Sequence, residues 1–365
     1  GIASARWPPG YPALLSLVVR VFGSHPVAGE ILNAFLGAAT VPLLYVLVKA
    51  HFGRRVGFIA AAMLCVMPGP ILWTELLMTE TLFTLMFVGF LLLVMRARPS
   101  WRWAIGLGIY VGLATLTRSE ALIWLTIPLV LWWREIGWKR SLSRVVVAGV
   151  TMLVVLMPWT IRNARAMDSF VLLSTNGGQT LWAGHNPNAN GMQNYPTEEH
   201  EASFGTGAEW EVKWYKGLQS EALHYMATHP VRELALIPAK LIALNRGDSY
   251  AFDWLNQEPD PLLGSTATAY VSMFADLAWF SLLSLTLLGV VVLHRSLWRT
   301  RLMVAIATAF GTALFVYGFL YYGNYRYRIP YEPLMMVVAA LVVDRGWRGL
   351  GLMCAADGAE RQDDC

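Results

Sequence analysis

Charged residues are scarce in this sequence. They account for 14% of its 365 residues, whereas about 25% is typical of soluble globular domains. Hydrophobic residues make up 56% of the chain, so apolar side chains stand where a soluble protein would carry charge. This composition excludes an ordinary soluble domain and indicates a protein that lies largely within a membrane.

Cysteines and nucleotide-binding signatures are also few. The three cysteines have neither the spacing of a disulfide framework nor that of a metal site. The sequence contains no Walker phosphate loop, no Rossmann glycine fingerprint and no G-x-S-x-G nucleophile elbow. These absences exclude the usual signatures of nucleotide-binding enzymes and serine hydrolases.

Long apolar runs dominate what is present. Several approach the roughly 20 residues that a helix needs to span a bilayer, and the shorter runs are able to tilt or to pair within a bundle. The sequence therefore predicts an all-α polytopic membrane protein with about nine transmembrane helices and an extracytoplasmic loop region. The predicted spans are residues 31–48, 56–73, 81–95, 103–117, 121–133, 145–161, 277–293, 302–320 and 333–343.

Basic residues gather in every second loop between these spans. The alternate loops lack such clusters, which is the positive-inside pattern of membrane proteins. It places the long polar segment outside the cytoplasm and the C-terminal tail inside, and it explains the net charge of +4 without a nucleic-acid partner. The clusters are Lys49/Arg54/Arg55, Arg96/Arg98/Arg102, Arg134/Lys139/Arg140/Arg144, Arg295/Arg299/Arg301 and Arg345/Arg348.

The same topology divides the chain into five parts. Because Gly1 is not an initiator methionine and the spans count from an outside N-terminus, we expect at least one upstream span to be missing from this sequence. Residues 13–22 are apolar but too short to cross, which predicts an interfacial helix. The parts are 1–27, the remnant of the first extracytoplasmic loop; 28–163, the first transmembrane bundle; 164–267, the extracytoplasmic loop region; 268–349, the last transmembrane helices; and 350–365, a cytoplasmic tail.

Local patterns add three expectations. Gly108 and Gly112 form a small-xxx-small pair that favours close packing of two spans. Within the polar loop, residues 207–227 and 231–244 read as helices separated by His229 and Pro230. The second of these is apolar and is predicted to lie at the bilayer surface.

Arginines at the outer ends of spans are the first candidates for chemistry. Arg162 and Asn163 end the run 145–161, and Tyr325, Arg326 and Arg328 precede the last span. Guanidinium groups bind phosphate well, and a low-dielectric boundary strengthens the attraction. Arginines at span ends also commonly extend to the interface with no ligand. We favour a phosphate site because outside loops are normally poor in arginine.

Carboxylates near the outer face are the second candidates. Glu80 begins a span, where it is either a site residue in a bundle cavity or a helix N-terminal charge beside Thr79. Arg118 and Glu120 lie in the short connection between two spans and are expected to form a structural ion pair.

The polar loop begins with a segment rich in glycine and asparagine. Asn176, Gly177, Gly178, His185 and Asn186 expose amide groups that suit sugar binding, although such residues more often serve turn geometry. His185 and His200 stand near two glutamates, but nothing matches zinc spacing, so no metal site is predicted and a divalent ion is left only as an alternative.

Several stretches, taken in order, resemble the polytopic glycosyltransferases of the GT-C superfamily. The group to which they are most similar is the bacterial relatives of protein O-mannosyltransferases and of the lipid A aminoarabinose transferase. The resemblance covers nearly the whole chain. The stretches are RWPPGYP at 6–12, MTETLF at 78–83, GLATLTRSEAL at 112–122, PWTIRN at 158–163, STNGG at 174–178, GHNPNANG at 184–191 and YRYRIPYEPL at 325–334.

This resemblance implies a site at the extracytoplasmic face of a bacterial inner membrane. It implies a polyprenyl-phosphate-linked sugar donor, direct displacement with inversion, and a protein, lipid A or glycan acceptor. The catalytic base of such families is an acidic residue upstream of the PPGYP-like element, a region absent here. Glu80 matches a second acidic site position, with a catalytic role in assisting the acceptor or a metal, and Arg162, Arg326 and Arg328, with Tyr325 beside them, match positions that bind the lipid phosphate.

Transport is the main competing function. A transporter or flippase for a lipid-linked or polar solute should show inverted repeats and polar groups at the membrane midplane. Here the polar groups collect at one face, which favours the enzyme. The sequence also leaves room for a non-catalytic membrane scaffold, and for an O-antigen ligase-like enzyme that uses diphosphate-linked oligosaccharide. The sugar, the acceptor and the oligomeric state are left open.

Overall fold

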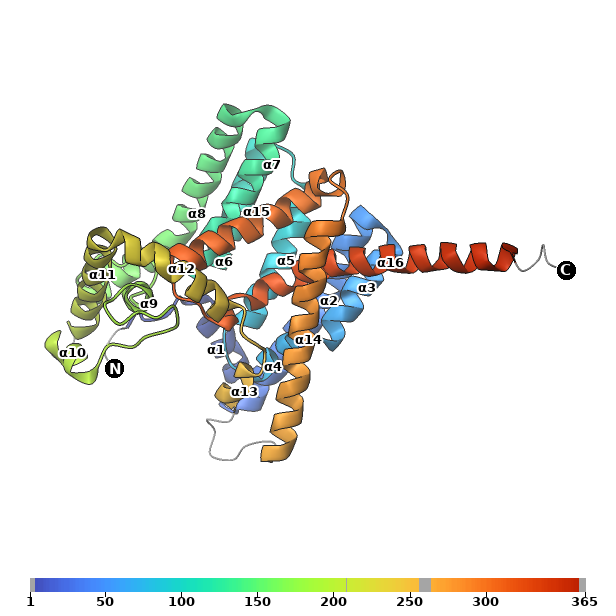
Figure 1. Cartoon of the computed structure of the whole chain (residues 1–365). Helices are drawn as coiled ribbons and strands as arrows, with labels where there is room; N and C mark the ends of the chain where they lie inside the picture. Colours follow the sequence, from blue (N-terminus) through green and yellow to red (C-terminus); the bar gives the residue numbers. More distant parts are fainter. Residues whose placement is uncertain (1–3, 208, 256–263, 361–365) are drawn as a thin grey trace.

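The computed structural model describes residues 4–207, 209–255 and 264–360, and in these ranges the regular structure is helical, with no strand (Figure 1). Short 3-10 or π turns, η1 to η5, join several of the helices. The helices are α1 (Gly10–Phe22), α2 (Pro26–Phe52), α3 (Arg54–Val66), α4 (Pro68–Glu75), α5 (Glu80–Arg96), α6 (Trp101–Thr115), α7 (Thr126–Ile136), α8 (Trp138–Met167), α9 (Asn176–Gly184), α10 (Glu198–Ser203), α11 (Trp210–Thr228), α12 (Pro230–Leu244), α13 (Tyr250–Leu255), α14 (Ser265–Val292), α15 (Arg301–Phe315) and α16 (Glu332–Glu360).

The all-α polytopic membrane architecture is confirmed, but the count of nine spans is not. In the described part, four helical segments are long and apolar enough to cross a bilayer: 26–52, 138–167, 266–292 and 301–320. A fifth is obtained if α3 and α4, bent by 47° at Met67, form one broken span. The predicted spans at 81–95, 103–117 and 121–133 form shorter helices: α5 has 17 residues, α6 has 15 and α7 has 11.

Two single glycines set the tightest turns in the bundle. Gly53 stands between α2 and α3 with φ of 89°, and Gly137 stands between α7 and α8 with φ of 80°. A residue with a side chain adopts such positive φ values only at an energetic cost, whereas glycine adopts them freely. Each glycine therefore lets one helix end and the next begin at once. Both turns carry the basic residues of two predicted cytoplasmic loops.

Helix α5 lies at the centre of the bundle (Figure 1). Its phenylalanines Phe83, Phe87 and Phe90 are buried and pack against Trp124 of η1 (Ser119–Leu125), with ring centroids 4.8, 4.9 and 5.3 Å apart. Burial of large aromatic rings contributes strongly to a core. This packing fixes the start of α5 against the connection that follows α6, which is where Glu80 and Arg118 meet.

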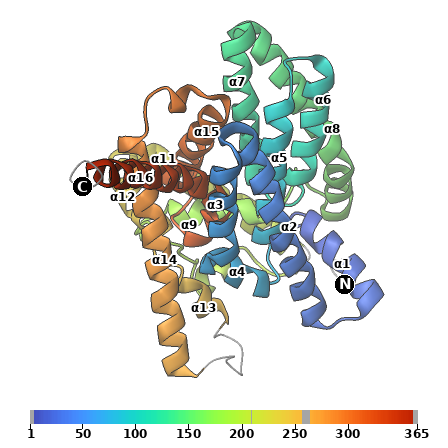
Figure 2. The same ribbon diagram turned by 90° about the vertical axis from the view of Figure 1, so that its right-hand side faces the viewer.

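The predicted extracytoplasmic loop region folds into short helices, of which α9 to α12 lie at one side of the bundle (Figure 1). Helices α9 and α11 pack through Trp182, Trp214 and Leu218. The two predicted loop helices are confirmed as α11 and α12, and the predicted interfacial segment forms α1. Figure 2 shows α7 at the opposite end of the bundle from α13.

Candidate active site

A cavity of about 510 Å³ lies where the bundle meets the predicted extracytoplasmic loop region. It is walled by the start of α1, the α4–α5 and α6–η1 connections, α9 and the segment 321–327. A volume in this range suits a small ligand or the head group of a larger one. Its charged and aromatic lining residues are Arg6, Trp7, Tyr11, Arg118, Glu120, Tyr195, Tyr321, Tyr322, Arg326 and Tyr327.

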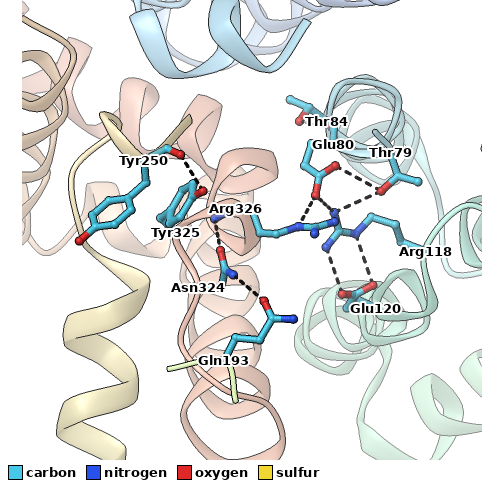
Figure 3. A network of polar contacts seen from close by, with 10 residues as sticks. All are labelled: Thr79, Glu80, Thr84, Arg118, Glu120, Gln193, Tyr250, Asn324, Tyr325 and Arg326. Carbon is cyan, nitrogen blue, oxygen red and sulfur yellow. Dashed lines mark hydrogen bonds and ion pairs between the residues drawn. The ribbon is translucent and has the colours of Figure 1, made fainter. Parts of the chain in front are cut away.

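At the base of the cavity, Glu80 bridges two arginines (Figure 3). Its Oε1 accepts from Arg118 Nη1 at 2.7 Å and from Arg326 Nε at 2.8 Å. Glu80 is the first residue of α5, Arg118 precedes η1, and Arg326 lies in η4 (Tyr325–Tyr327). One carboxylate therefore fixes three segments that are far apart in the sequence.

A second carboxylate completes the network. Glu120 accepts from Arg118 Nη2 at 3.2 Å and from its Nε at 3.5 Å, while Thr79 Oγ1 accepts from Nη1 at 3.3 Å. The Arg118 guanidinium also lies 5.4 Å from the Phe83 ring centroid, within cation–π range. Arg118 is buried and fully engaged, so it is held rigidly rather than extended into solvent.

Arg326 has hydrogen-bonding capacity to spare. Among the described residues only its Nε and its backbone N–H are hydrogen-bonded, so the two terminal nitrogens are available to a ligand. Its side chain is 20% exposed, against 7% for Arg118 and 0% for Glu80. Counting Arg6, the cavity network holds three arginines and two glutamates, a surplus of one positive charge. This arrangement favours an anion.

Tyrosines form the wall beside Arg326. Tyr321, Tyr322 and Tyr327 line the cavity, and Tyr327 stacks on Tyr317 at 4.9 Å with the two rings 5° from parallel. Burial raises the pKa of Tyr321 and of Tyr322. The hydroxyls of both therefore keep their protons at neutral pH, and they are able to donate hydrogen bonds into the cavity.

The structure brings only some of the sequence-predicted residues to this cavity. Glu80 and Arg326 form its charged base, and Asn176 and Gly177 line its side. Gly178 instead permits close packing, since a Cβ there would lie 2.2 Å from the Tyr215 carbonyl oxygen.

Arg162 and Asn163 stand apart from the cavity lining. Arg162 Nη1 donates to the Ser4 carbonyl at 2.9 Å, and its guanidinium lies 4.9 Å from the Trp159 ring centroid. Buried Asn163 donates through Nδ2 to the Val171 carbonyl at 3.2 Å. Both residues tie the outer end of α8 to neighbouring backbone, so Arg162 and Arg326 do not share one site.

Arg328 and Tyr325 lie behind the cavity. Arg328 is buried with Asp248 and with Glu332, whose Oε1 is 3.2 Å from its Nε, and its guanidinium lies 3.7 Å from the Trp279 ring centroid. The Tyr325 hydroxyl donates to the Tyr250 carbonyl at 2.9 Å. These residues support the 325–331 segment from the far side.

The histidines of the loop region do not converge. His185 pairs with Glu233, whereas His200 pairs with Glu221 at 3.1 Å. Within the described ranges there is no group of three His, Cys, Asp or Glu side chains suited to a metal ion. Asn186 holds a turn, donating to the Trp182 carbonyl at 2.8 Å and accepting from the Asn188 backbone at 2.9 Å.

Sequence reasoning did not propose seven of the charged and aromatic cavity residues as site residues: Arg6, Trp7, Tyr11, Tyr195, Tyr321, Tyr322 and Tyr327. It also assigned Arg118 only to a local pair with Glu120, whereas the structure shows a second ion pair with Glu80. The signal that was available is the density of tyrosine and arginine in 321–328, which is unusual beside a membrane span.

Comparisons with known proteins identify the fold. Residues 6–161 match the sequence profile of the family described as dolichyl-phosphate-mannose-protein mannosyltransferase. Comparison with curated protein sequences found no match. Among solved structures, the oligosaccharyltransferase of Archaeoglobus fulgidus in its apo form aligns with a TM-score of 0.53 and 14% identity, over 98% of this chain and 45% of that one. The chain shares the fold of this oligosaccharyltransferase.

Two further solved structures were found to be similar. The archaeal oligosaccharyltransferase AglB from Archaeoglobus fulgidus, in complex with an inhibitory peptide and a dolichol-phosphate, has a TM-score of 0.52 and 15% identity, over 97% of this chain and 44% of that one. ArnT from Cupriavidus metallidurans bound to undecaprenyl phosphate has a TM-score of 0.41 and 14% identity, over 94% and 69%. The chain thus spans less than half the length of the oligosaccharyltransferases.

Proposed function

We propose that this chain belongs to an enzyme that transfers a sugar from a polyprenyl-phosphate-linked donor to an acceptor at the extracytoplasmic membrane face. The observation that carries the proposal is the pairing of Arg118 and Arg326 around buried Glu80 at the base of an aromatic-walled cavity. A neighbour of the same fold was solved with a dolichol-phosphate. That lipid phosphate has the chemistry that a surplus of guanidinium groups recognises.

The arginines suit the leaving group of this reaction. When the bond between the sugar and the phosphate breaks, negative charge grows on the phosphate oxygens. Arg326, with two free terminal nitrogens, is placed to bind those oxygens, and Arg118 adds positive charge behind it. Since Glu80 fixes both guanidinium groups before substrate arrives, little reorganisation is needed as charge develops, and the transition state is stabilised more than the ground state.

Glu80 in this proposal positions the arginines rather than taking a proton. Its carboxylate is fully buried and already paired with two cations, and Glu120 is paired with Arg118. A carboxylate held in this way is a poor base. Proton removal from the acceptor hydroxyl is therefore assigned to a carboxylate outside this network, and Tyr321 and Tyr322 are placed to donate hydrogen bonds to the sugar or phosphate.

The test follows the donor in native membranes. Cells lacking the protein would receive the full-length wild type, Arg326→Ala or Arg165→Ala, and the polyprenyl-phosphate-sugar species would be measured by mass spectrometry. Arg165 is the matched control, because it is an exposed arginine near the outer end of α8 and outside the cavity lining. We expect wild type and Arg165→Ala to deplete one species, and Arg326→Ala to turn it over about 100-fold more slowly.

Three outcomes are informative. A depleted species names the donor and supports the transferase. Unchanged pools in cells that express the wild type well would reject the enzyme in favour of transport. Equal depletion by Arg326→Ala and wild type would reject the assigned phosphate site while keeping the activity.

A further inference from the structure

Three ionisable side chains meet in the loop region away from the charged base of the cavity. His185 follows the C-terminus of α9, and Glu233 and Lys240 lie two turns apart on one face of α12. His185 Nδ1 is 2.6 Å from Glu233 Oε2, and Lys240 Nζ is 3.4 Å from His185 Nε2 and 3.9 Å from Glu233 Oε2. Both His185 and Lys240 are buried, at 1% and 0% exposure.

The hydrogen bonds fix where the protons lie. A carboxylate oxygen only accepts, so His185 donates through Nδ1 to Glu233. Nε2 of the neutral ring then has a lone pair that accepts from the Lys240 ammonium. The three groups together carry one negative and one positive charge and are balanced inside the protein. Burying a charge without such a partner would destabilise the folded protein strongly.

This cluster lies against the segment that walls the cavity. Helix α12 packs on η3 (Val316–Leu320) and η4, and the His185 side chain lies against the Leu320 backbone. At Gly184, an added Cβ would lie 2.8 Å from the Tyr321 carbonyl oxygen, so α9 also touches this backbone directly.

Two glycines complete the contact between α12 and the wall. Gly323 donates from its backbone N–H to the Gly191 carbonyl at 2.8 Å. An added Cβ at Gly323 would lie 2.0 Å from the Lys240 carbonyl oxygen, and one at Gly191 would lie 2.7 Å from the Ala239 carbonyl carbon. The backbone that carries Tyr321 and Tyr322 is therefore pressed between α9, the 191 turn and α12.

We propose that His185, Glu233 and Lys240 form a clasp that positions Tyr321 and Tyr322 on the wall of the Arg118–Arg326 cavity. The clasp joins α9 to α12 across the segment 320–323, so its integrity sets where the two tyrosine hydroxyls point. As a contribution to catalysis, this inference rests on the proposed transferase function. It gives a role to the GHNPNANG stretch, whose histidine and asparagine lie outside the cavity lining.

The clasp is sensitive to protons. Burial, followed by the Lys240 charge, lowers the pKa of His185 below its ordinary value of 6.5, against the opposing effects of Glu233 and the Leu320 backbone. Burial likewise lowers the pKa of Lys240 to about 8, against Glu233. Protonating His185 would turn Nε2 into a donor facing the ammonium. Since the unfolded chain binds that proton more readily, the clasp is complete between pH 6.5 and about 8 and weakens as the pH falls through the lower, folded-state pKa of His185. Above about pH 8, Lys240 loses the proton that pairs it with Glu233.

Hydrogen–deuterium exchange of residues 316–328 tests the positioning without an activity assay. Glu233→Gln leaves the buried ammonium without its counter-charge, so we expect exchange there to rise about tenfold. The double variant Glu233→Gln/Lys240→Met removes both charges and should return exchange to within about twofold of wild type. Glu209→Gln is the matched control, because its pair with Lys213 is 79% and 60% exposed. Unchanged exchange in Glu233→Gln, or no recovery in the double variant, would overturn the clasp.

Two further readouts separate this inference from the proposed function. After correction for intrinsic rates, exchange of 316–328 should rise several-fold from pH 7.5 to 5.5 in wild type but not in His185→Gln, which takes up no proton. Equal pH responses would count against the clasp.

In the donor-depletion assay, Glu233→Gln should slow turnover at least fivefold. A loosened segment with full turnover would reject the catalytic contribution. If the wild type depletes no donor, both the transferase function and the catalytic contribution of the clasp are rejected. The exchange data for residues 316–328 still test separately whether the clasp holds this segment in place.

Discussion

Arg326 and Arg328 are two residues apart and have opposite surroundings. Arg326 faces the cavity, whereas Arg328 is buried between Asp248, Glu332 and the Trp279 ring. The short 3-10 turn η4 explains the difference, because successive residues of such a turn point about 120° apart. The sequence suggested one site for both arginines because it shows that they are close in the chain, but not in which direction each side chain points.

Arg328 is expected to govern stability. Arg328→Met keeps most of the side-chain volume but leaves two buried carboxylates, Asp248 and Glu332, without their cation. Breaking a buried charge pair in this way costs about 3–5 kcal/mol, so thermal unfolding in detergent should begin well below the wild-type temperature. Arg165→Met is the exposed control and should unfold like wild type. Coincident melting curves for all three proteins would show that the Arg328 cluster is not needed for the fold.

Glu80 illustrates what sequence reasoning was able to reach at this scale. A carboxylate beside an apolar run is costly, and that cost alone marked it as a candidate. Its partners lie 38 and 246 residues away in the chain, and nothing local identifies them. Its assignment as a catalytic residue stays a prediction, while its contacts support a positioning role.

At the scale of elements, α6 and α8 make one of the closest contacts in the bundle. An added Cβ at Gly108 would lie 2.4 Å from the Ala148 carbonyl oxygen, and one at Gly112 would lie 2.7 Å from Val155 Cβ. The predicted close packing of spans at this glycine pair is thereby confirmed. This contact could be predicted from the sequence because two small residues four positions apart lie on the same face of a helix.

Gly108→Val should separate these two helices. The new side chain would collide with α8 backbone, which is unable to give way as a flexible side chain would, so we expect a loss of about 2–3 kcal/mol in stability and poor expression. Gly106→Val is the control on the same helix, since a Cβ there meets nothing within 4 Å. Quantifying folded protein by fluorescence-detected size exclusion compares them; similar yields from both variants would contradict the packing.

The number of spans was harder to obtain from the sequence than their apolar character. Helix α5 is apolar and buried on many sides, so hydropathy found it, and its 17 residues lie at the lower end of the length that spans a bilayer. The break near Thr117 turns the chain into η1 before α7 begins. The hydropathy of a segment predicts that it is buried, but it does not distinguish burial against lipid from burial against other helices.

For the whole molecule, the alternation of basic loops predicts which face each loop occupies. In a variant with its native cysteines replaced by serine, Ser203→Cys lies in the loop region and Ser296→Cys beside Arg295; both positions are exposed. A membrane-impermeant maleimide should label the first in intact cells and the second only after permeabilisation. The reverse pattern of labelling would invert the topology and place the cavity on the cytoplasmic side.

The buried position of Glu80 has a consequence for how the cavity responds to ionic strength. At about 0.15 M salt, exposed charges are screened over about 8 Å, so attraction between the basic loops and anionic lipid head groups fades as salt is added. Counterions have no access to a carboxylate with 0% exposure or to a guanidinium with 7%. The ion pair between Glu80 and Arg118 should therefore persist in concentrated electrolyte, and the base of the cavity should keep its shape where surface attraction has been lost. Arg326, with 20% of its side chain exposed, stays open to competing anions.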